Sequence, residues 1–292
     1  MSYEGTATLM NAVDQIAGYQ VLAVLGYGAN STIYAVQDPK DEHVYALKRV
    51  VKRTANDQRF IDQAVNEHEV ASRLDHPALR SSYRMIRRRK VLRVSEVLIL
   101  MELVDGVTLE QHRPPRLRDV VRVFIEVASG LDAMHKAQFV HADIKPNNVL
   151  LAENDGVKLI DFGQSCRSGT VKNRIQGTPD YIAPEQVKRG PITAQTDVFN
   201  LGATIYWCVT NQYVPTMIPR SDKEVGLKAD TELKKPRDLN PSLPTSFERL
   251  ILHCLETSPD KRPASMNEVK SRLEIVLHQL ERGRNGDSSG ED

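Results

Sequence analysis

The chain has 292 residues, of which 40% are apolar and 26% charged, and its net charge is +1. This length allows a full core and is long for one compact domain, so a two-lobed globule is expected. The near-neutral charge argues against a general binder of nucleic acid or membranes. The three cysteines show neither pairing nor metal-ligand spacing, which favours a reducing, cytoplasmic setting over a secreted one.

The two ends of the chain carry little structural signal. Residues 1–18 lack the basic and apolar regions of a signal peptide, so we expect an N-terminal extension there. Residues 283–292 are polar and rich in glycine, which predicts a disordered tail. No apolar run approaches the roughly 20 residues that a membrane-spanning helix needs.

The stretch from residue 19 to residue 103 is dominated by strand patterns. Alternating or β-rich runs predict strands at Val21–Leu25, Thr32–Gln37, Val44–Val51 and Val97–Leu103. One helix is expected between them, from Gln58 to Leu74. The first two strands flank a turn with Gly26 and Gly28, where missing Cβ atoms would let backbone N–H groups approach phosphate oxygens.

The glycine turn is a weak signal by itself, because two glycines in a β-turn usually mark only a hairpin. Its place between two strands, just ahead of Lys48, strengthens the phosphate interpretation. A strand follows the turn instead of a helix, which disfavours a Rossmann or P-loop motif.

Lys48 and Glu67 are expected to form an ion pair. Strand alternation places Lys48 on one face with Ala46, and helical spacing places Glu67 within an apolar stripe. Each charge would be costly to bury alone, and the two together are plausible as a pair. The alternative is that Lys48 lies on an edge strand and extends its ammonium group into water without an ion pair.

The basic run Arg84–Lys90 has two interpretations. A solvated strand face with a turn is favoured over a docking site for an acidic partner or a phosphate.

After Gly106 the periodicity becomes helical, and the switch near Val104 is the expected hinge. Helices are predicted at Leu117–His135, Asp197–Val209, Ser246–Leu255 and Val269–Leu280. A small strand-rich half followed by a larger helical half predicts an α+β, bilobal fold. The expected division is 19–103 for the first lobe and 104–282 for the second.

Four polar residues near the middle of the chain suggest phosphoryl transfer. Asp143 is the candidate base for a hydroxyl, and Lys145 the candidate cation for the transferred group. Asn148 and Asp161 offer oxygens suited to magnesium. Each residue alone could serve a turn, but their joint order and spacing argue against chance. His141 is expected to be structural.

These motifs, taken in order, resemble those of eukaryotic-type Ser/Thr protein kinases over about residues 19–280. Residues 240–244 and 254–259 resemble bacterial members of that family. The matching segments are the glycine turn with Ser31 in the third glycine position, Tyr45–Lys48, Glu67, His141–Asp143, Asn148, Asp161–Gly163, Ala183–Glu185, Asp197 and Arg262. The loop that contains Lys145 is similar to the corresponding loop of Ser/Thr kinases, whereas tyrosine kinases carry a different loop there.

The resemblance implies an activity, cofactors and further site residues. It implies transfer of the ATP γ-phosphoryl group to protein Ser/Thr hydroxyls, autophosphorylation included, with Mg²⁺ or alternatively Mn²⁺. It implies an Arg262–Glu185 ion pair. The implied nucleotide site comprises Leu25, Gly26, Gly28, Ser31, Ile33, Ala46, Lys48, Met101 as gatekeeper, Glu102 and Val104 in the hinge, and Leu150 below adenine.

Two other functions are alternatives to an active kinase. A pseudokinase scaffold would be suggested by loss of Lys48, Asp143 or Asp161, and none is lost. A small-molecule phosphotransferase would generally lack Ala183–Glu185 and Arg262. The substrate sequence is not readable, and a homodimer is an option that the sequence leaves open.

Ala142 departs from the family pattern, in which kinases regulated by loop phosphorylation carry arginine at this position. Alanine cannot bind a loop phosphate, so activity is expected not to depend on phosphorylation between Gln164 and Gln176. Ser165, Ser168 and Thr170 are either autophosphorylation sites or ordinary loop residues. Cys166 is expected to be exposed beside Arg167, which would favour its thiolate.

Overall fold

The computed structural model describes residues 15–28, 30–90, 93–152, 156–215 and 232–287. Most of the expected N-terminal extension, residue 29 of the glycine turn and positions 288–292 of the expected tail lie outside these residues. The chain divides into two compact units. The sheet unit comprises Met1–Val65 and Ser82–Leu103, and the helical unit comprises Asn66–Ser81 and Val104–Asp292.

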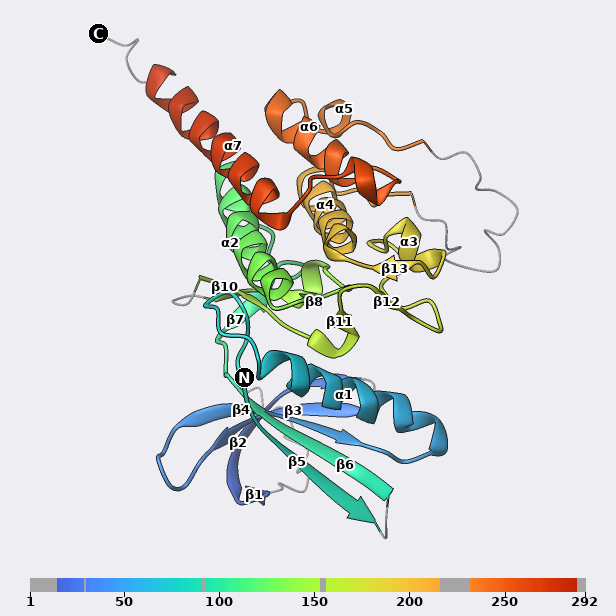
Figure 1. The fold of residues 1–292 in the computed structure, drawn as a ribbon. Coiled ribbons are helices and arrows are strands. Elements are labelled where there is room, and N and C mark those ends of the chain that lie inside the picture. The colour runs from blue at the N-terminus through green and yellow to red at the C-terminus, as the bar shows by residue number, and fades with distance from the viewer. Residues whose placement is uncertain (1–14, 29, 91–92, 153–155, 216–231, 288–292) are drawn as a thin grey trace, which may run out of the picture. The chain divides into compact units, whose positions relative to one another are not determined.

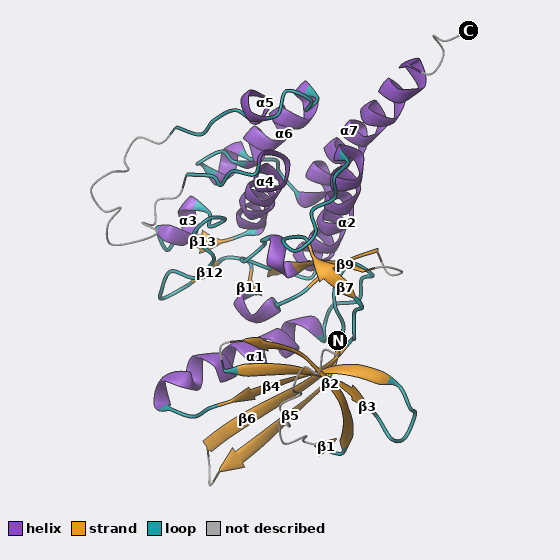
Figure 2. Cartoon of the chain, turned by 180° about the vertical axis from the view of Figure 1, so that it is seen from behind, coloured by secondary structure: helices purple, strands orange, loops and turns teal. Residues whose placement is uncertain are grey.

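The sheet unit contains a six-stranded antiparallel sheet (Figure 2). Its order is β1 (Gln15–Ile16), β2 (Tyr19–Gly28), β3 (Ser31–Gln37), β4 (Val44–Val51), β6 (Arg93–Met101) and β5 (Ser82–Lys90). The predicted strand Val44–Val51 matches β4 at both ends. Strand β6 begins four residues before its prediction and ends at Met101.

Both faces of this sheet are covered. On one face, Leu47 and Leu98 pack with Ile16 and Tyr19 from the start of the chain. On the other, Val50 and Ile99 pack with residues of α1 (Gln58–Ala71). Because side chains alternate along a strand, β4 and β6 contribute to both clusters.

Strand β5 carries the basic run at the edge of the sheet. Five basic side chains on it are exposed, at positions 84 and 87–90. Charged residues on an edge strand discourage pairing with another chain. The run therefore lies on an exposed strand, as expected, and whether it also docks a partner stays a prediction. Arg88 also binds Glu96 of β6 at 3.1 Å.

The helical unit is built around one large apolar core. Its helices are α2 (Leu117–Lys136), α3 (Pro184–Val187), α4 (Ala194–Thr210), α5 (Pro236–Leu239), α6 (Thr245–Cys254) and α7 (Met266–Asp287). Helices α2 and α7 lie side by side (Figure 1). The four predicted helices agree with α2, α4, α6 and α7, and α4 begins three residues earlier than expected.

Helix α7 corrects one expectation about the C-terminus. It continues to Asp287, so the first five residues of the expected disordered tail are helical. The apolar stripe ends earlier, so periodicity alone could not place this end. None of the helices in the described ranges combines the length and apolarity needed to cross a membrane.

Short strands in the helical unit position the loops between its helices. They form a three-stranded sheet of β10 (Gly156–Leu159), β9 (Val149–Ala152) and β7 (Gly106–Thr108), and two pairs, β11 (Cys166–Arg167) with β8 (Phe139–Val140) and β12 (Thr170–Val171) with β13 (Pro191–Ile192). Gly106 packs so tightly that a Cβ there would lie 2.4 Å from the Leu151 carbonyl oxygen. A glycine is therefore required just after the expected hinge.

Candidate active site

The loop from His141 to Asn148 is anchored by Asp197, a fully buried carboxylate on α4. Asp197 accepts hydrogen bonds from the backbone N–H groups of His141 (2.9 Å) and Ala142 (2.7 Å) and from the His135 ring (2.8 Å). Burial acts to raise the pKa of Asp197, but these bonds outweigh it and hold that pKa below its ordinary value. Ala142 lies in the left-handed region with φ of 62°, a strained backbone that these bonds stabilise.

Asp143 is almost completely buried, and its carboxylate has partners on both oxygens. Lys145 Nζ donates to Oδ2 at 3.1 Å. The Thr178 N–H and hydroxyl donate to Oδ1 at 3.1 and 3.0 Å. Lys145 also donates to the Thr178 hydroxyl at 2.9 Å, so base, cation and threonine form one hydrogen-bonded triangle.

Asn148 and Asp161 are brought together by the backbone between them. The Asn148 amide donates to the Asp143 carbonyl at 2.8 Å, which leaves its side-chain oxygen as an acceptor. The N–H of Ile160, next to Asp161, donates to the Asn148 carbonyl at 3.0 Å. Asp161 adopts a left-handed conformation with φ of 64° and accepts from Gly163 N–H at 3.4 Å.

This donor set suits magnesium. One carboxylate and one amide oxygen, completed by phosphate and water oxygens, match the coordination that Mg²⁺ prefers. No cluster of three or more His, Cys, Asp or Glu residues that could hold a metal occurs among the described residues, and a site of this kind needs none.

His141 is completely buried, with its ring against Phe162 and its Nε2 3.2 Å from the Ile160 carbonyl oxygen. These contacts join the loop to the Asp161 segment. They agree with the expected structural role of the histidine.

Glu67 is buried on α1, whereas Glu69 is exposed, as helical spacing predicted. Its carboxylate binds Arg80 at 3.1 Å, a partner that the sequence reasoning missed. The only signal was a charge directly after the apolar residues Ala78 and Leu79. The pairing of Glu67 with Lys48 involves both units and stays a prediction.

The nucleotide-binding candidates of the sheet unit lie on adjacent strands. Ile33 of β3 stands opposite Lys48 of β4, and Ala46 stands opposite Met101 of β6. Ala46 and Met101 are buried, and Lys48 is half-buried. Gly26 and Gly28 lie in β2 and not in the turn expected from the sequence, with Gly26 paired to Ile33 and Gly28 to Ser31 of β3, and Leu25 is exposed. Glu102 follows β6, whereas Val104 and Leu150 belong to the helical unit, so the complete adenine site stays a prediction.

The segment after Asp161 is held by short strands and one lysine. Strand β11 pairs with β8, and β12 pairs with β13. Lys172 donates from Nζ to the carbonyl of Gln164. This bond joins the residues before β11 to the residue directly after β12. Burial lowers the pKa of Lys172, against the attraction of Cys166 and Asp143.

The expected exposure of Cys166 is wrong. The residue is half-buried, and burial raises the pKa of its thiol, although Lys172 and Thr170 act in the opposite direction. The neighbouring Arg167 instead lies over the Phe139 ring and donates to the Ala137 carbonyl.

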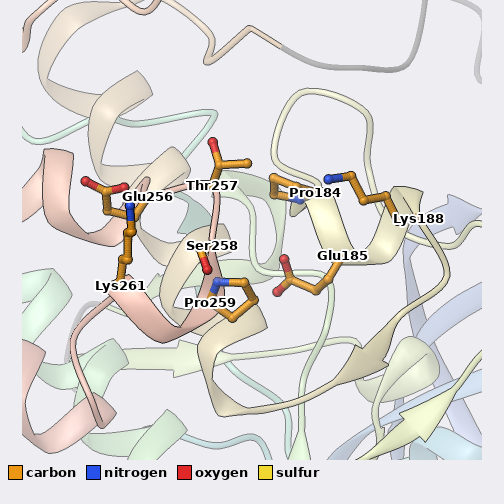
Figure 3. A pocket seen from close by; sticks show the side chains of 8 residues that line it. All are labelled: Pro184, Glu185, Lys188, Glu256, Thr257, Ser258, Pro259 and Lys261. Carbon is orange, nitrogen blue, oxygen red and sulfur yellow. The ribbon is translucent and has the colours of Figure 1, made fainter.

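The end of the same segment is fixed by a buried ion pair. Arg262 donates to both oxygens of Glu185, at 2.8 and 2.9 Å, as the family resemblance implied. Thr196 also donates to Glu185 at 2.9 Å. A cavity of about 540 Å³ lies beside this pair, with Lys188 and Lys261 among its lining residues (Figure 3). None of the phosphoryl-transfer candidates lines it.

Comparison with known proteins identifies the family. The family model described as protein kinase domain matches residues 19–273. Serine/threonine-protein kinase PrkC of Bacillus subtilis is 29% identical over 89% of the chain and 40% of its own length. Serine/threonine-protein kinase PknL of Mycobacterium tuberculosis is 28% identical over 90% of the chain and 66% of its own length. The chain thus spans less than two thirds of either relative.

A solved structure supports the same assignment. The Mycobacterium tuberculosis PknI kinase domain matches with a TM-score of 0.70 and 26% identity, covering 92% of this chain and all of that one. The family match, the fold and the arrangement around Asp143 lead to one conclusion: the chain belongs to the protein kinase domain family.

Proposed function

We propose that the chain is a serine/threonine protein kinase that transfers the γ-phosphoryl group of ATP to protein hydroxyls. The observation that carries this proposal is the triangle of Asp143, Lys145 and Thr178. A carboxylate and an ammonium held side by side support the proposal, because phosphoryl transfer to a hydroxyl needs both groups. The relatives of the chain reported above are named serine/threonine-protein kinases.

Asp143 would orient the substrate hydroxyl and accept its proton. Its partners Lys145 and Thr178 hold the carboxylate in one orientation, which matters because phosphoryl transfer depends mainly on positioning. Lys145 would then move with the transferring group and balance its negative charge. A substrate hydroxyl would have to displace the bond from Thr178 or approach beside it.

Asn148 and Asp161 would hold Mg²⁺ through oxygen, and the bound ion would neutralise phosphate charge. The bond from the Asn148 amide to the Asp143 carbonyl fixes which atom of the side chain faces away from the loop. Lys48, aided by Glu67, would bind nucleotide phosphates. Ile33, Ala46 and Leu150 would contact adenine, and Met101 through Val104 would form the hinge.

Activity without loop phosphorylation is also part of the proposal. Ala142 supplies no cation for a loop phosphate, and its N–H is already bound by Asp197. A cytoplasmic location and a homodimer stay predictions.

Replacement of Asp143 tests the proposed function. Asp143→Asn should abolish phosphorylation of a generic basic protein while ATP–Mg²⁺ still binds, because the amide cannot accept the hydroxyl proton. Asp119→Asn, at a half-buried position of α2 that pairs with Arg122, is the matched control. Mass-spectrometric mapping of autophosphorylation sites would settle Ser/Thr against Tyr.

Two outcomes would contradict the proposal. A wild-type protein that binds ATP–Mg²⁺ but transfers to no protein would favour a pseudokinase scaffold. An Asp143→Asn variant with wild-type activity would remove Asp143 from the mechanism.

A further inference from the structure

Arg80 forms a buried ion pair that the kinase motifs do not require. Its Nη2 lies 3.1 Å from Oε1 of Glu67, and the two side chains are only 10% and 4% exposed. Removing one partner of such a pair leaves an uncompensated buried charge. The pair therefore fixes the position of the Glu67 carboxylate within the helical unit.

The backbone of Arg80 is attached to the strand that leads to Asp161. Arg80 N–H donates to the Leu159 carbonyl at 3.0 Å, and Leu159 N–H donates to the Ala78 carbonyl at 2.7 Å. Leu159 is the last residue of β10, two positions before Asp161. The residue whose guanidinium binds Glu67 is thus anchored to the strand that directly precedes the predicted magnesium ligand.

Asn66, the residue before Glu67, makes a second connection to this segment. Its amide lies 2.8 Å from the Ser165 carbonyl and 3.2 Å from the Phe162 carbonyl. An amide has two hydrogens, so both bonds can form together. Neighbouring residues of α1 therefore reach the stretch before and the stretch after Asp161.

We propose that Arg80 is a positioning residue for phosphoryl transfer, which it serves by holding Glu67 in a fixed place relative to Asp161. This inference rests on the proposed function. Arg80 binds Oε1, and a carboxylate can accept on both oxygens, so the contact is compatible with the predicted bond between Glu67 and Lys48.

The inference also offers a physical basis for the predicted activity without a loop phosphate. Where Ala142 replaces arginine, a phosphate cannot organise the segment after Asp161 through that position. Arg80 and Asn66 supply permanent connections between α1 and this segment. The order that phosphorylation would otherwise induce is then built into the chain.

The test compares Arg80→Met with Arg73→Met, an exposed arginine of the same region. Arg80→Met should lower kcat/KM for ATP by about 20-fold or more, an effect the size of one lost charged contact, whereas Arg73→Met should stay within about twofold. Arg80→Lys keeps the charge and should recover part of the loss. Thermal unfolding of each variant shows whether it is folded at the assay temperature.

A double-mutant cycle separates positioning from a general structural role. If Arg80 acts through Glu67, Arg80→Met should cost little more than about twofold in a Glu67→Gln background. If Arg80→Met does not fold, the same cycle is run with Arg80→Lys, with the same expectation of non-additivity.

Two results would overturn the inference. One is a folded Arg80→Met enzyme whose kcat/KM equals that of Arg73→Met. The other is an equal loss from the Arg80 change with and without the Glu67 carboxylate. Inactivity of the wild-type protein would instead contradict the proposed function and is seen before any variant is made.

Discussion

The loop that carries Asp143 and the segment that follows Asp161 are held by different kinds of contact. The loop is anchored by the buried Asp197 carboxylate, which accepts hydrogen bonds from two successive backbone N–H groups. The following segment relies on strand pairs of two residues each and on the Lys172 side chain. Its far end is again fixed by a buried charge, at Glu185.

This difference indicates which parts of the site are preformed. Charge-assisted hydrogen bonds in the interior are strong and costly to break, whereas strand pairs of only two residues each open at little cost. The loop should therefore keep its geometry in every state of the enzyme. The segment between Gln164 and Gln176 is the part that can respond to a substrate.

The largest effect is expected from Arg262→Met, which leaves Glu185 buried without its cation. Loss of one partner from a buried ion pair costs about 3–5 kcal/mol. Urea unfolding would measure the change, with Arg249→Met, an exposed arginine on α6, as the control. Equal stability of the two variants would show that the Glu185 anchor contributes little.

Asp197→Asn should have the next largest effect, because an amide presents one acceptor where the carboxylate presents two. We expect a loss of about 2–3 kcal/mol in stability and a marked fall in kcat as the loop loosens. Asp119→Asn is again the matched control. An unchanged kcat would mean that the loop keeps its form without the buried anion.

The pH dependence of stability, compared between the wild-type protein and Asp197→Asn, sharpens this test. The pKa of Asp197 is lowered in the folded state, so its contribution is present above the unfolded pKa and is lost as pH falls through the folded value. Wild-type stability should therefore fall on acidification by more than that of Asp197→Asn. Parallel acid unfolding curves would contradict the assignment.

Lys172→Met should weaken the segment after Asp161 without unfolding the protein. We expect about a tenfold loss of kcat but a stability change below about 1 kcal/mol, since the partner is one carbonyl oxygen. Lys136→Met, at a side chain that is 77% exposed, is the control. A stability loss as large as that of Asp197→Asn would show that segment and loop are held equally firmly.

The smallest effect is expected from phosphatase treatment. Because Ala142 offers no cation for a loop phosphate, kcat should change by less than about twofold, the scale of a weak surface charge effect. A Ser168→Ala/Thr170→Ala variant should behave like the treated enzyme. A large loss of kcat on treatment would restore loop phosphorylation as the switch.

Much of the fold followed from periodicity, and the places where it failed have physical reasons. The strand Val44–Val51 and the start of α2 at Leu117 were placed correctly because their patterns end at clear breaks. The end of α7 was not, because its last residues are polar and the helix continues beyond its apolar stripe. Cys166 was misjudged because strand pairing buries it, and pairing partners distant in sequence leave no local pattern.

By itself the sequence determined the order of the motifs, the buried face of Glu67 and the residues offered for phosphoryl transfer. Spacing along one helix or one loop is local information, and local geometry follows from it. Only the tertiary structure decided that Arg80 binds Glu67, that Asn66 binds the Ser165 carbonyl and that Lys172 binds Gln164. Those contacts join segments whose side chains meet only once the chain has folded, and each depends on distances that no periodicity encodes.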